Sequence, residues 1–297
     1  MTASRPTPTP RPWSADAASK PYPWPEGKTS AAWISIDVDA DPPLLWRQRD
    51  QADAGYLSER EQRQYGLRAG ITRLLEVLAR HEVQATFFVP GLVAERRPDL
   101  LPALIGRGHE VGLHGYAHEA TREIDDAAFG AALERSLALF TAQTGRPPAG
   151  FRAPGWELTR GMHAMLRASG LYDSSLAGHD HPYTLDGVTE LPVSWTREDT
   201  MRFKVTGLDA RWAPTSPHLV LEEWLFDWEA CSEAGALFTL TLHDWVSGRP
   251  TACRVLDRLL ARIRRDETCW LATGTMLAGH HGALDPETIL QASSGAA

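Results

Sequence analysis

Two pairs of side chains in this sequence have the types and spacing of a metal-dependent hydrolytic site. Asp37 and Asp39 follow an apolar stretch, and His114 and His118 follow a second one. Side chains of a strand repeat every second residue, so both aspartates would point to one face. The i, i+4 spacing brings two imidazoles to one ion, and Gly115 favours a loop over a helix turn. One carboxylate can hold a metal while the other moves a proton, which predicts a mononuclear metallohydrolase.

Short apolar stretches alternate with longer amphipathic ones along most of the chain. Strands are expected at 33–38, 85–89, 110–113, 150–152, 172–174, 189–192 and 237–242. Helices are expected at 66–80, 98–107, 125–144, 159–168, 219–234 and 252–265. This order is typical of βα repeats around a parallel sheet, and about seven repeats in one domain favour an α/β barrel over an open sheet.

The expected strands also predict where the reactive side chains meet. In βα barrels the working residues lie at the C-terminal ends of the strands. Five candidates fall there, namely Asp37, Asp39, His114, Arg152 and His243. We therefore expect one site at one mouth of the barrel.

Composition narrows the possible partners and the location. The 297 residues are 43% hydrophobic and 23% charged, with a formal net charge of -8, which argues against nucleic-acid binding. No stretch has the length and apolarity of a membrane span or a signal peptide, so we expect no membrane partner and a cytoplasmic location. Cys231, Cys253 and Cys269 are odd in number and widely spaced, which predicts buried thiols.

The chain divides into an arm and one domain. Residues 1–30 are rich in proline and lack periodicity, so they predict a flexible or surface-packed arm. Residues 31–297 are expected to form a single barrel domain.

Several motifs resemble, in order, those of polysaccharide deacetylases with the NodB-homology fold. They are 37–39 (DVD), 85–91 (ATFFVPG), 108–118 (GHEVGLHGYAH), 151–155 (FRAPG) and 240–243 (LTLH). Within that superfamily, 24–28 (WPEGK), 180–183 (DHPY) and 190–195 (ELPVSW) resemble a cytoplasmic branch. That branch includes peptidoglycan-deacetylase-like proteins, allantoinase-like proteins and cyclic-imide hydrolases.

The resemblance implies a distorted, TIM-like (β/α)7 barrel and hydrolysis of a C–N bond, typically in an N-acetyl amide. It also implies a divalent metal, usually zinc, with cobalt, nickel and manganese as alternatives. Carried over by position, the roles are a catalytic base at Asp37, metal ligands at Asp39, His114 and His118, a base-orienting residue at Arg152 and a catalytic acid at His243. Cytoplasmic relatives are often tetrameric, so a homo-oligomer, tetramer or dimer, is expected. Secreted members usually carry adjacent aspartates, and the separation here weakens the case for a glycan substrate.

The roles of these residues agree with the chemistry of amide hydrolysis. An Asp-His-His set leaves open positions on zinc, so that a water becomes nucleophilic. The planar fork of Arg152 is suited to grip Asp37 through paired hydrogen bonds. Either Asp199 or Asp244 is expected to orient His243 and raise its pKa.

A further group of residues is expected to bind substrate. Asp180 and Tyr183 belong to one of the branch motifs, and Trp156, Trp195 and Trp245 each follow a motif closely. The set predicted to line the substrate pocket is Asp180, Tyr183, Trp156, Trp195 and Asp199.

Three functions compete at this stage. The leading one is metal-dependent deacetylation of an acetamido sugar or another N-acylated small molecule. The second is ring opening of allantoin or a cyclic imide; relatives of that kind often lack an intact aspartate pair, whereas this chain keeps Asp37 and Asp39. The third is a non-catalytic carbohydrate-binding protein that has kept the barrel.

Overall fold

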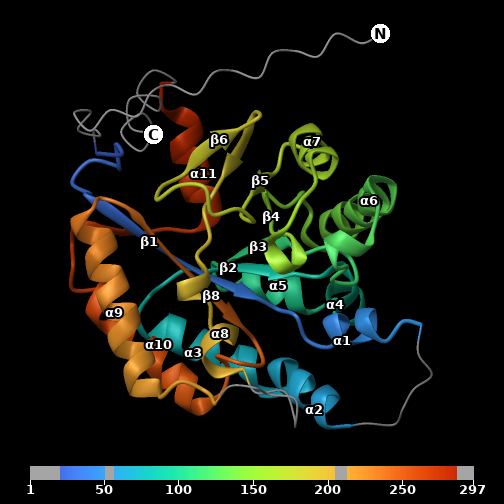
Figure 1. Cartoon of the computed structure of the whole chain (residues 1–297), viewed down its shortest axis with the longest axis horizontal. Coiled ribbons are helices and arrows are strands. Elements are labelled where there is room, and N and C mark those ends of the chain that lie inside the picture. The colour runs from blue at the N-terminus through green and yellow to red at the C-terminus, as the bar shows by residue number, and fades with distance from the viewer. Residues whose placement is uncertain (1–20, 51–56, 205–212, 286–297) are drawn as a thin grey trace.

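Seven parallel strands form a curved sheet at the centre of the computed structural model, which describes residues 21–50, 57–204 and 213–285 (Figure 1). The parallel strands are β1 (Ser30–Asp37), β2 (Thr86–Val89), β3 (Glu110–Leu113), β4 (Gly150–Phe151), β5 (Tyr172–Asp173), β7 (Val188–Glu190) and β8 (Leu237–His243). Their order is β7-β5-β4-β3-β2-β1-β8. Strand β6 (Tyr183–Leu185) pairs antiparallel with β7, and a short further parallel strand outside this order, β9 (Cys269–Leu271), pairs with the first residues of β1.

The barrel is closed between β7 and β8 by irregular chain and not by regular strand pairing. The amide of Asp199 donates to the carbonyl of Thr241 at 3.1 Å, and the hydroxyl of Thr239 donates to the carbonyl of Pro192 at 2.8 Å. Seven parallel strands with one irregular closure confirm the predicted distorted (β/α)7 barrel.

Helices cover the outside of the sheet (Figure 1). The longer ones are α3 (Ile71–Arg80), α6 (Asp126–Thr144), α7 (Arg160–Ala168), α9 (Pro217–Glu233), α10 (Pro250–Ile263) and α11 (Gly274–Ala283). The shorter ones are α1 (Pro42–Arg47), α2 (Ser58–Tyr65), α4 (Gly91–Arg96), α5 (Leu100–Ile105) and α8 (Thr200–Phe203). Helices α3, α10 and α9 pack side by side, as do α4, α6 and α7.

Every strand and helix expected from the sequence is present, with ends that differ by a few residues. Elements that the sequence did not predict are α1, α2, α4, α8, α11, β6 and β9. The helix expected at 66–80 begins as a π-helical turn over Gly66–Gly70 that joins α2 to α3. A Cβ at Gly66 would lie 1.9 Å from Asp244 Oδ2, so this turn packs directly on the residue that follows β8.

Strand β1 is buried on both faces, and the two faces have different functions. Ala32, Ile34 and Ile36 belong to the large core beneath the helices. The alternate residues point into the barrel, where Ser35 and Asp37 lie at the C-terminal half of the strand. The strand period of two therefore separates core packing from polar chemistry within a single element.

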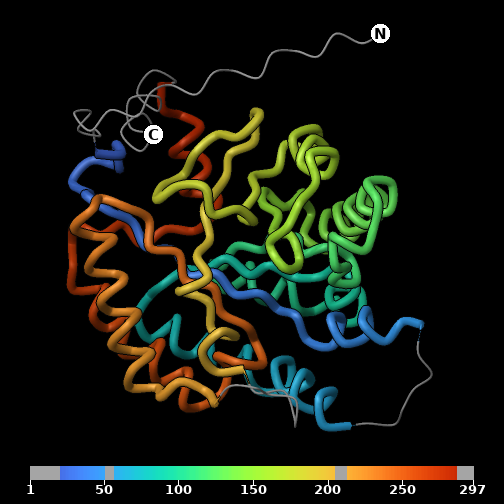
Figure 2. Tube along the Cα trace, viewed as in Figure 1, coloured from blue at the N-terminus to red at the C-terminus, as the bar shows by residue number. Residues whose placement is uncertain are grey.

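The described part of the proline-rich arm packs on the N-terminal end of the barrel. The indole of Trp24 donates to the carbonyl of Gly235 at 2.8 Å, and Tyr22 Oη lies 3.0 Å from His281 Nδ1. The start of the described chain and helix α11 therefore lie side by side (Figure 2). The first part of the arm, residues 1–20, and the predicted domain end, 286–297, lie outside the described residues.

No helix within 21–50, 57–204 and 213–285 has the length and apolarity needed to cross a membrane. The cytoplasmic location and the homo-oligomer stay predictions.

We expect folding stability to fall in mild acid because of His281. Burial, followed by the charges of His181 and His280, lowers the pKa of His281 from 6.5 to about 4. The unfolded chain therefore binds a proton that the folded chain resists, and stability is lost as pH falls from 6.5 to about 4, by up to ~3 kcal/mol. Urea unfolding at pH 7.5 and 5 should show a smaller pH difference for His281→Asn than for the parent, and equal differences would contradict this.

Candidate active site

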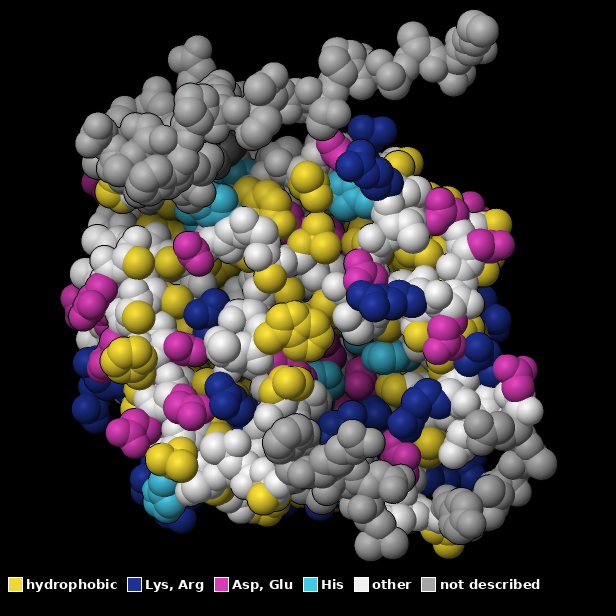
Figure 3. Space-filling model, viewed as in Figure 1, with side chains coloured by type: hydrophobic (Ala, Val, Ile, Leu, Met, Phe, Trp, Pro, Cys, Tyr) yellow, Lys and Arg dark blue, Asp and Glu magenta, His cyan; other side chains and the backbone are white. Residues whose placement is uncertain are grey.

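The predicted reactive side chains meet in one pocket at the C-terminal ends of the strands. Asp37 and His243 are the last residues of β1 and β8, while His114 and Arg152 directly follow β3 and β4. The pocket has a volume of about 340 Å³. In the space-filling view, acidic and histidine side chains lie at the bottom of this depression, with basic side chains along one side (Figure 3).

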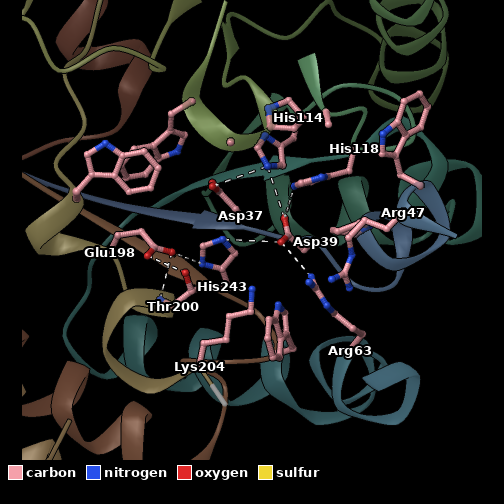
Figure 4. A pocket seen from close by; sticks show the side chains of 18 residues that line it. Asp37, Asp39, Arg47, Arg63, His114, His118, Glu198, Thr200, Lys204 and His243 are labelled. Atoms are coloured by element: carbon pink, nitrogen blue, oxygen red, sulfur yellow. Dashed lines mark hydrogen bonds and ion pairs between the residues drawn. The ribbon is translucent and has the colours of Figure 1, made fainter. Parts of the chain in front are cut away.

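Asp39, His114 and His118 form a group with the geometry of metal ligands. Asp39 Oδ1 lies 3.5 Å from His114 Nε2 and 3.4 Å from His118 Nε2 (Figure 4). This oxygen is buried and has no hydrogen-bond partner among the described residues. His114 Nδ1 donates to the carbonyl of Arg152 at 2.7 Å, which leaves Nε2 as the nitrogen free to bind a metal. The donor set therefore fits a divalent metal with histidine and carboxylate ligands.

The charges around Asp39 keep it ionised. Burial raises the pKa of Asp39, but the neighbouring imidazoles of His118, His243 and His114 hold it well below its usual value. A metal ligand must be deprotonated, so this carboxylate is ready to bind.

His114 and His118 lie on a loop, as expected from Gly115 between them. Gly115 has φ +67°, and a Cβ there would lie 2.6 Å from Glu119 Oε2. Glu119 is buried and accepts hydrogen bonds from the amides of Tyr116 (2.9 Å) and Ala117 (2.8 Å). His118 itself has φ 56°, a strained conformation for a residue with a Cβ. The loop is therefore held in one shape that turns both imidazoles toward Asp39.

Arg152 is fully buried and contacts Asp37, as expected, but with one hydrogen bond and not two. Its Nη1 donates to Asp37 Oδ1 at 2.9 Å and to Ser35 Oγ at 2.8 Å. Its Nε and Nη2 donate to the carbonyl and hydroxyl of Ser174 at 3.1 and 2.9 Å. The expected paired grip on Asp37 is thus wrong, because the fork is shared among three residues and leaves Asp37 Oδ2 directed toward His114 Nε2, 3.9 Å away.

Asp199, and not Asp244, orients His243. Asp199 Oδ1 lies 2.7 Å from His243 Nδ1, and Asp199 Oδ2 accepts from the His243 amide at 2.8 Å. Burial lowers the pKa of His243, but Asp199 and Asp39 outweigh it and raise this pKa well above its usual value. Both carboxylate oxygens of Asp244 lack a hydrogen-bond partner among the described residues, and burial and Asp39 raise its pKa to about 8.

Of the expected substrate-binding residues, the tryptophans line the pocket and the others do not. Trp156 and Trp195 line the pocket, with ring centroids 4.3 Å apart, and Trp245 lines it as well. Asp199 is fully buried behind His243, so its expected contact with substrate is wrong.

Asp180 and Tyr183 do not reach the pocket. The carbonyl of Asp180 accepts from the amide of Leu237, the first residue of β8, whereas His243 is the last. Tyr183 pairs with Glu190 in the β6–β7 hairpin. Neither residue lines the pocket, so their expected contact with substrate is wrong, because the 180–183 motif leads into the β6–β7 hairpin.

Some pocket residues had no signal in the sequence. Arg47 and Arg63 come from α1 and α2, and Lys204 follows α8. Glu198 also lines the pocket and lies next to Asp199, with its Oε1 3.3 Å from His243 Nδ1. These residues stand in no recognisable motif, and only the path of the chain over the barrel mouth brings them to the site.

Comparison with known proteins finds relatives over most of the chain. The sequence profile described as polysaccharide deacetylase matches residues 53–173. A crystal structure from Mycobacterium smegmatis described as a polysaccharide deacetylase is 34% identical, with a TM-score of 0.83, over 90% of this chain and 95% of that one. A peptidoglycan deacetylase of Helicobacter pylori is 29% identical over 67% of this chain and 78% of its own length. The crystal structure of the allantoinase Puue is 22% identical, with a TM-score of 0.78, over 94% of this chain and 99% of that one.

We expect the purified chain to bind one divalent ion through Asp39, His114 and His118. His118→Ala removes one of three ligands and should weaken Zn²⁺ binding by ~100-fold or more in a calorimetric titration. His218→Ala is the matched control, because His218 is an exposed residue at the start of α9. Unchanged zinc affinity in His118→Ala would rule out this ligand group.

Proposed function

Since the chain belongs to the polysaccharide deacetylase family, hydrolases of carbon–nitrogen bonds other than peptide bonds, we propose that it removes an N-acetyl group with the help of a divalent metal. The substrate would be an acetamido sugar or another N-acylated small molecule. The observation that carries this proposal is that a base, a ligand group and an acid line one pocket, with Asp37 and His243 both close to the ligand group (Figure 4).

Asp39, His114 and His118 would hold the metal, with zinc first and cobalt, nickel or manganese as alternatives. When bound, such an ion supplies a Lewis acid that polarises the amide carbonyl and lowers the pKa of a water toward ~7. Asp39 Oδ1 is buried without a hydrogen-bond partner in the described part of the chain, which supports its role as the carboxylate ligand.

Asp37 acts as the general base in this proposal. Its Oδ1 is held by Arg152, so Oδ2 accepts the proton of the water that attacks the carbonyl carbon. The guanidinium stabilises the carboxylate before proton transfer and stays fully buried, away from water. Ser35 and Ser174 keep the guanidinium in place through their own hydrogen bonds.

His243 acts as the general acid. Asp199 binds the Nδ1 side of the ring, so Nε2 faces the pocket, 3.8 Å from Asp39 Oδ2. A proton on Nε2 is therefore available to the nitrogen that leaves when the amide C–N bond breaks. Asp199 stabilises the charged imidazole and sets its orientation, as a carboxylate does for a catalytic histidine elsewhere.

Ring opening of a cyclic amide is the second candidate. The overall likeness to an allantoinase supports only a shared fold at 22% identity. The intact pair Asp37 and Asp39, both in the same pocket, favours the metal-dependent deacetylase over this alternative.

We expect acetate release from N-acetylated substrates that stops on chelation and returns with added Zn²⁺. Asp37→Asn removes the base and His243→Gln removes the acid, so each should lower kcat by ~100-fold or more. Asp99→Asn is the matched control, because Asp99 is exposed and lies outside the pocket. The measurement is a coupled acetate assay for the N-acetylated substrates, with the loss of allantoin and succinimide followed by chromatography.

Three results would contradict the proposal. Full activity after the metal has been chelated would mean that the reaction does not need a metal. Turnover of allantoin or succinimide without acetate release from any substrate would favour the ring-opening reaction, and glycan binding without hydrolysis would favour a binding protein.

A further inference from the structure

Three cationic side chains lie along one wall of the active-site pocket. They are Arg47 at the end of α1, Arg63 in α2 and Lys204 just after α8. Figure 4 shows Arg63 and Lys204 on the side of Asp39 opposite His114 and His118. None of the three has a role in the proposed proton transfers, so their presence in the pocket calls for another explanation.

Arg63 is buried and incompletely paired. Arg63 is 4% exposed, and its Nη1 lies 3.3 Å from Asp39 Oδ2. Its guanidinium lies 4.4 Å above the ring of Trp245. The Nε atom is buried and has no hydrogen-bond partner among the described residues. An unpaired buried N–H costs stability unless a ligand supplies the acceptor.

Lys204 is close to the same tryptophan without an anionic partner. Its ammonium lies 6.0 Å from the ring of Trp245, and it makes no hydrogen bond or ion pair with the residues that the structure describes. Partial burial, followed by the charges of Arg63 and Arg47, lowers the pKa of Lys204. Two like charges therefore lie near the ring of Trp245, and of these Arg63 is paired with Asp39 whereas Lys204 has no ion pair with the described residues.

The carboxylates of the pocket are already engaged elsewhere. Asp37 accepts from Arg152, and Asp39 faces the two histidines. Glu198 accepts from the Thr200 hydroxyl at 2.8 Å and the Met201 amide at 2.9 Å. Arg47 is paired with Glu59 and is half exposed at the pocket mouth. Among the described residues, the cationic groups of this wall that have no carboxylate partner are the Lys204 ammonium and the Nε–H of Arg63, whose Nη1 is paired with Asp39.

We propose that the substrate carries a carboxylate close to the scissile acetamide, and that Arg63 and Lys204 bind this carboxylate. This inference rests on the proposed deacetylation. Arg63 contacts Asp39 itself, so an anion bound by Arg63 lies directly beside the reacting amide. The substrate class is an N-acetylated compound whose carboxylate is a few bonds from the acetamide, as in an acidic amino sugar or an N-acetyl amino acid.

Matched pairs of ligands test the proposal and distinguish an acidic amino sugar from an N-acetyl amino acid as the substrate. N-acetylmuramic acid and N-acetylglucosamine differ only in a carboxylate-bearing ether, and N-acetyl-L-alanine and its amide form the second pair. Binding to metal-depleted protein can be followed by tryptophan fluorescence, because Trp156, Trp195 and Trp245 line the pocket. In at least one pair the member with the carboxylate should bind about tenfold more tightly than the neutral member. This difference in affinity should become smaller at high salt, because exposed charges are screened.

Substitutions of Lys204 test whether the cationic wall of the pocket causes the tighter binding of carboxylate-bearing ligands. Lys204→Met should lower the ratio of carboxylate to neutral affinity about tenfold, and Lys204→Arg should restore most of it. Lys28→Met is the matched control, because Lys28 donates to the carbonyl of Glu267 at the far end of β1. A ratio that is the same in Lys204→Met and the parent would overturn the proposal, as would a preference that appears only after metal is added.

These measurements keep the inference separate from the proposed function. Equal affinities within both pairs, together with acetate release from the neutral members, would overturn the inference and leave the deacetylase standing. A carboxylate preference that depends on Lys204, without acetate release from any compound, would support the anion site and overturn the deacetylase.

Discussion

A single buried arginine connects the parts of the active site. Arg152 follows β4, and its side chain donates to Ser35 and Asp37 on β1 and to Ser174 after β5. Its carbonyl accepts from His114, which follows β3. One residue therefore sets the distance between the proposed base, Asp37, and the proposed metal ligand His114. Taking either partner from a buried ion pair leaves an uncompensated charge, at a cost on the order of 3–5 kcal/mol, so this connection also constrains the folding of the barrel.

The second constraint is the alternation of side chains along β1. The same strand packs Ile34 and Ile36 against the helices and directs Ser35 and Asp37 into the barrel. A shift of one residue in register would exchange these two sets and put the carboxylate into the apolar core. Pairing of β1 with β2 on one side and β8 on the other holds the register, and the β8 pairing sets His243 opposite Asp37.

Asp199 and Asp180 lie in very different places in the barrel, although both were expected to bind substrate. Both belong to stretches near family-like motifs, yet Asp199 lies behind His243 and Asp180 lies at the beginning of β8. The 191–199 segment runs along β8 in place of a regular strand and thereby brings Glu198 and Asp199 to the site. A sequence pattern identifies strands by periodicity, and this irregular segment has none. Arg63 and Lys204 were not expected for another reason, because Arg63 lies in α2 and Lys204 follows α8, two helices that the sequence pattern did not predict.

The sequence by itself determined the order of strands and helices, the barrel class and the side chains at the strand ends. These follow from local rules, because strand period and βα alternation place Asp37, His114, Arg152 and His243 at one mouth whatever the details of packing. Tertiary structure alone decided which carboxylate orients His243, how Arg152 divides its hydrogen bonds, and which cations reach the pocket. Such choices depend on distances between segments far apart in the chain, and no periodicity within either segment encodes those distances.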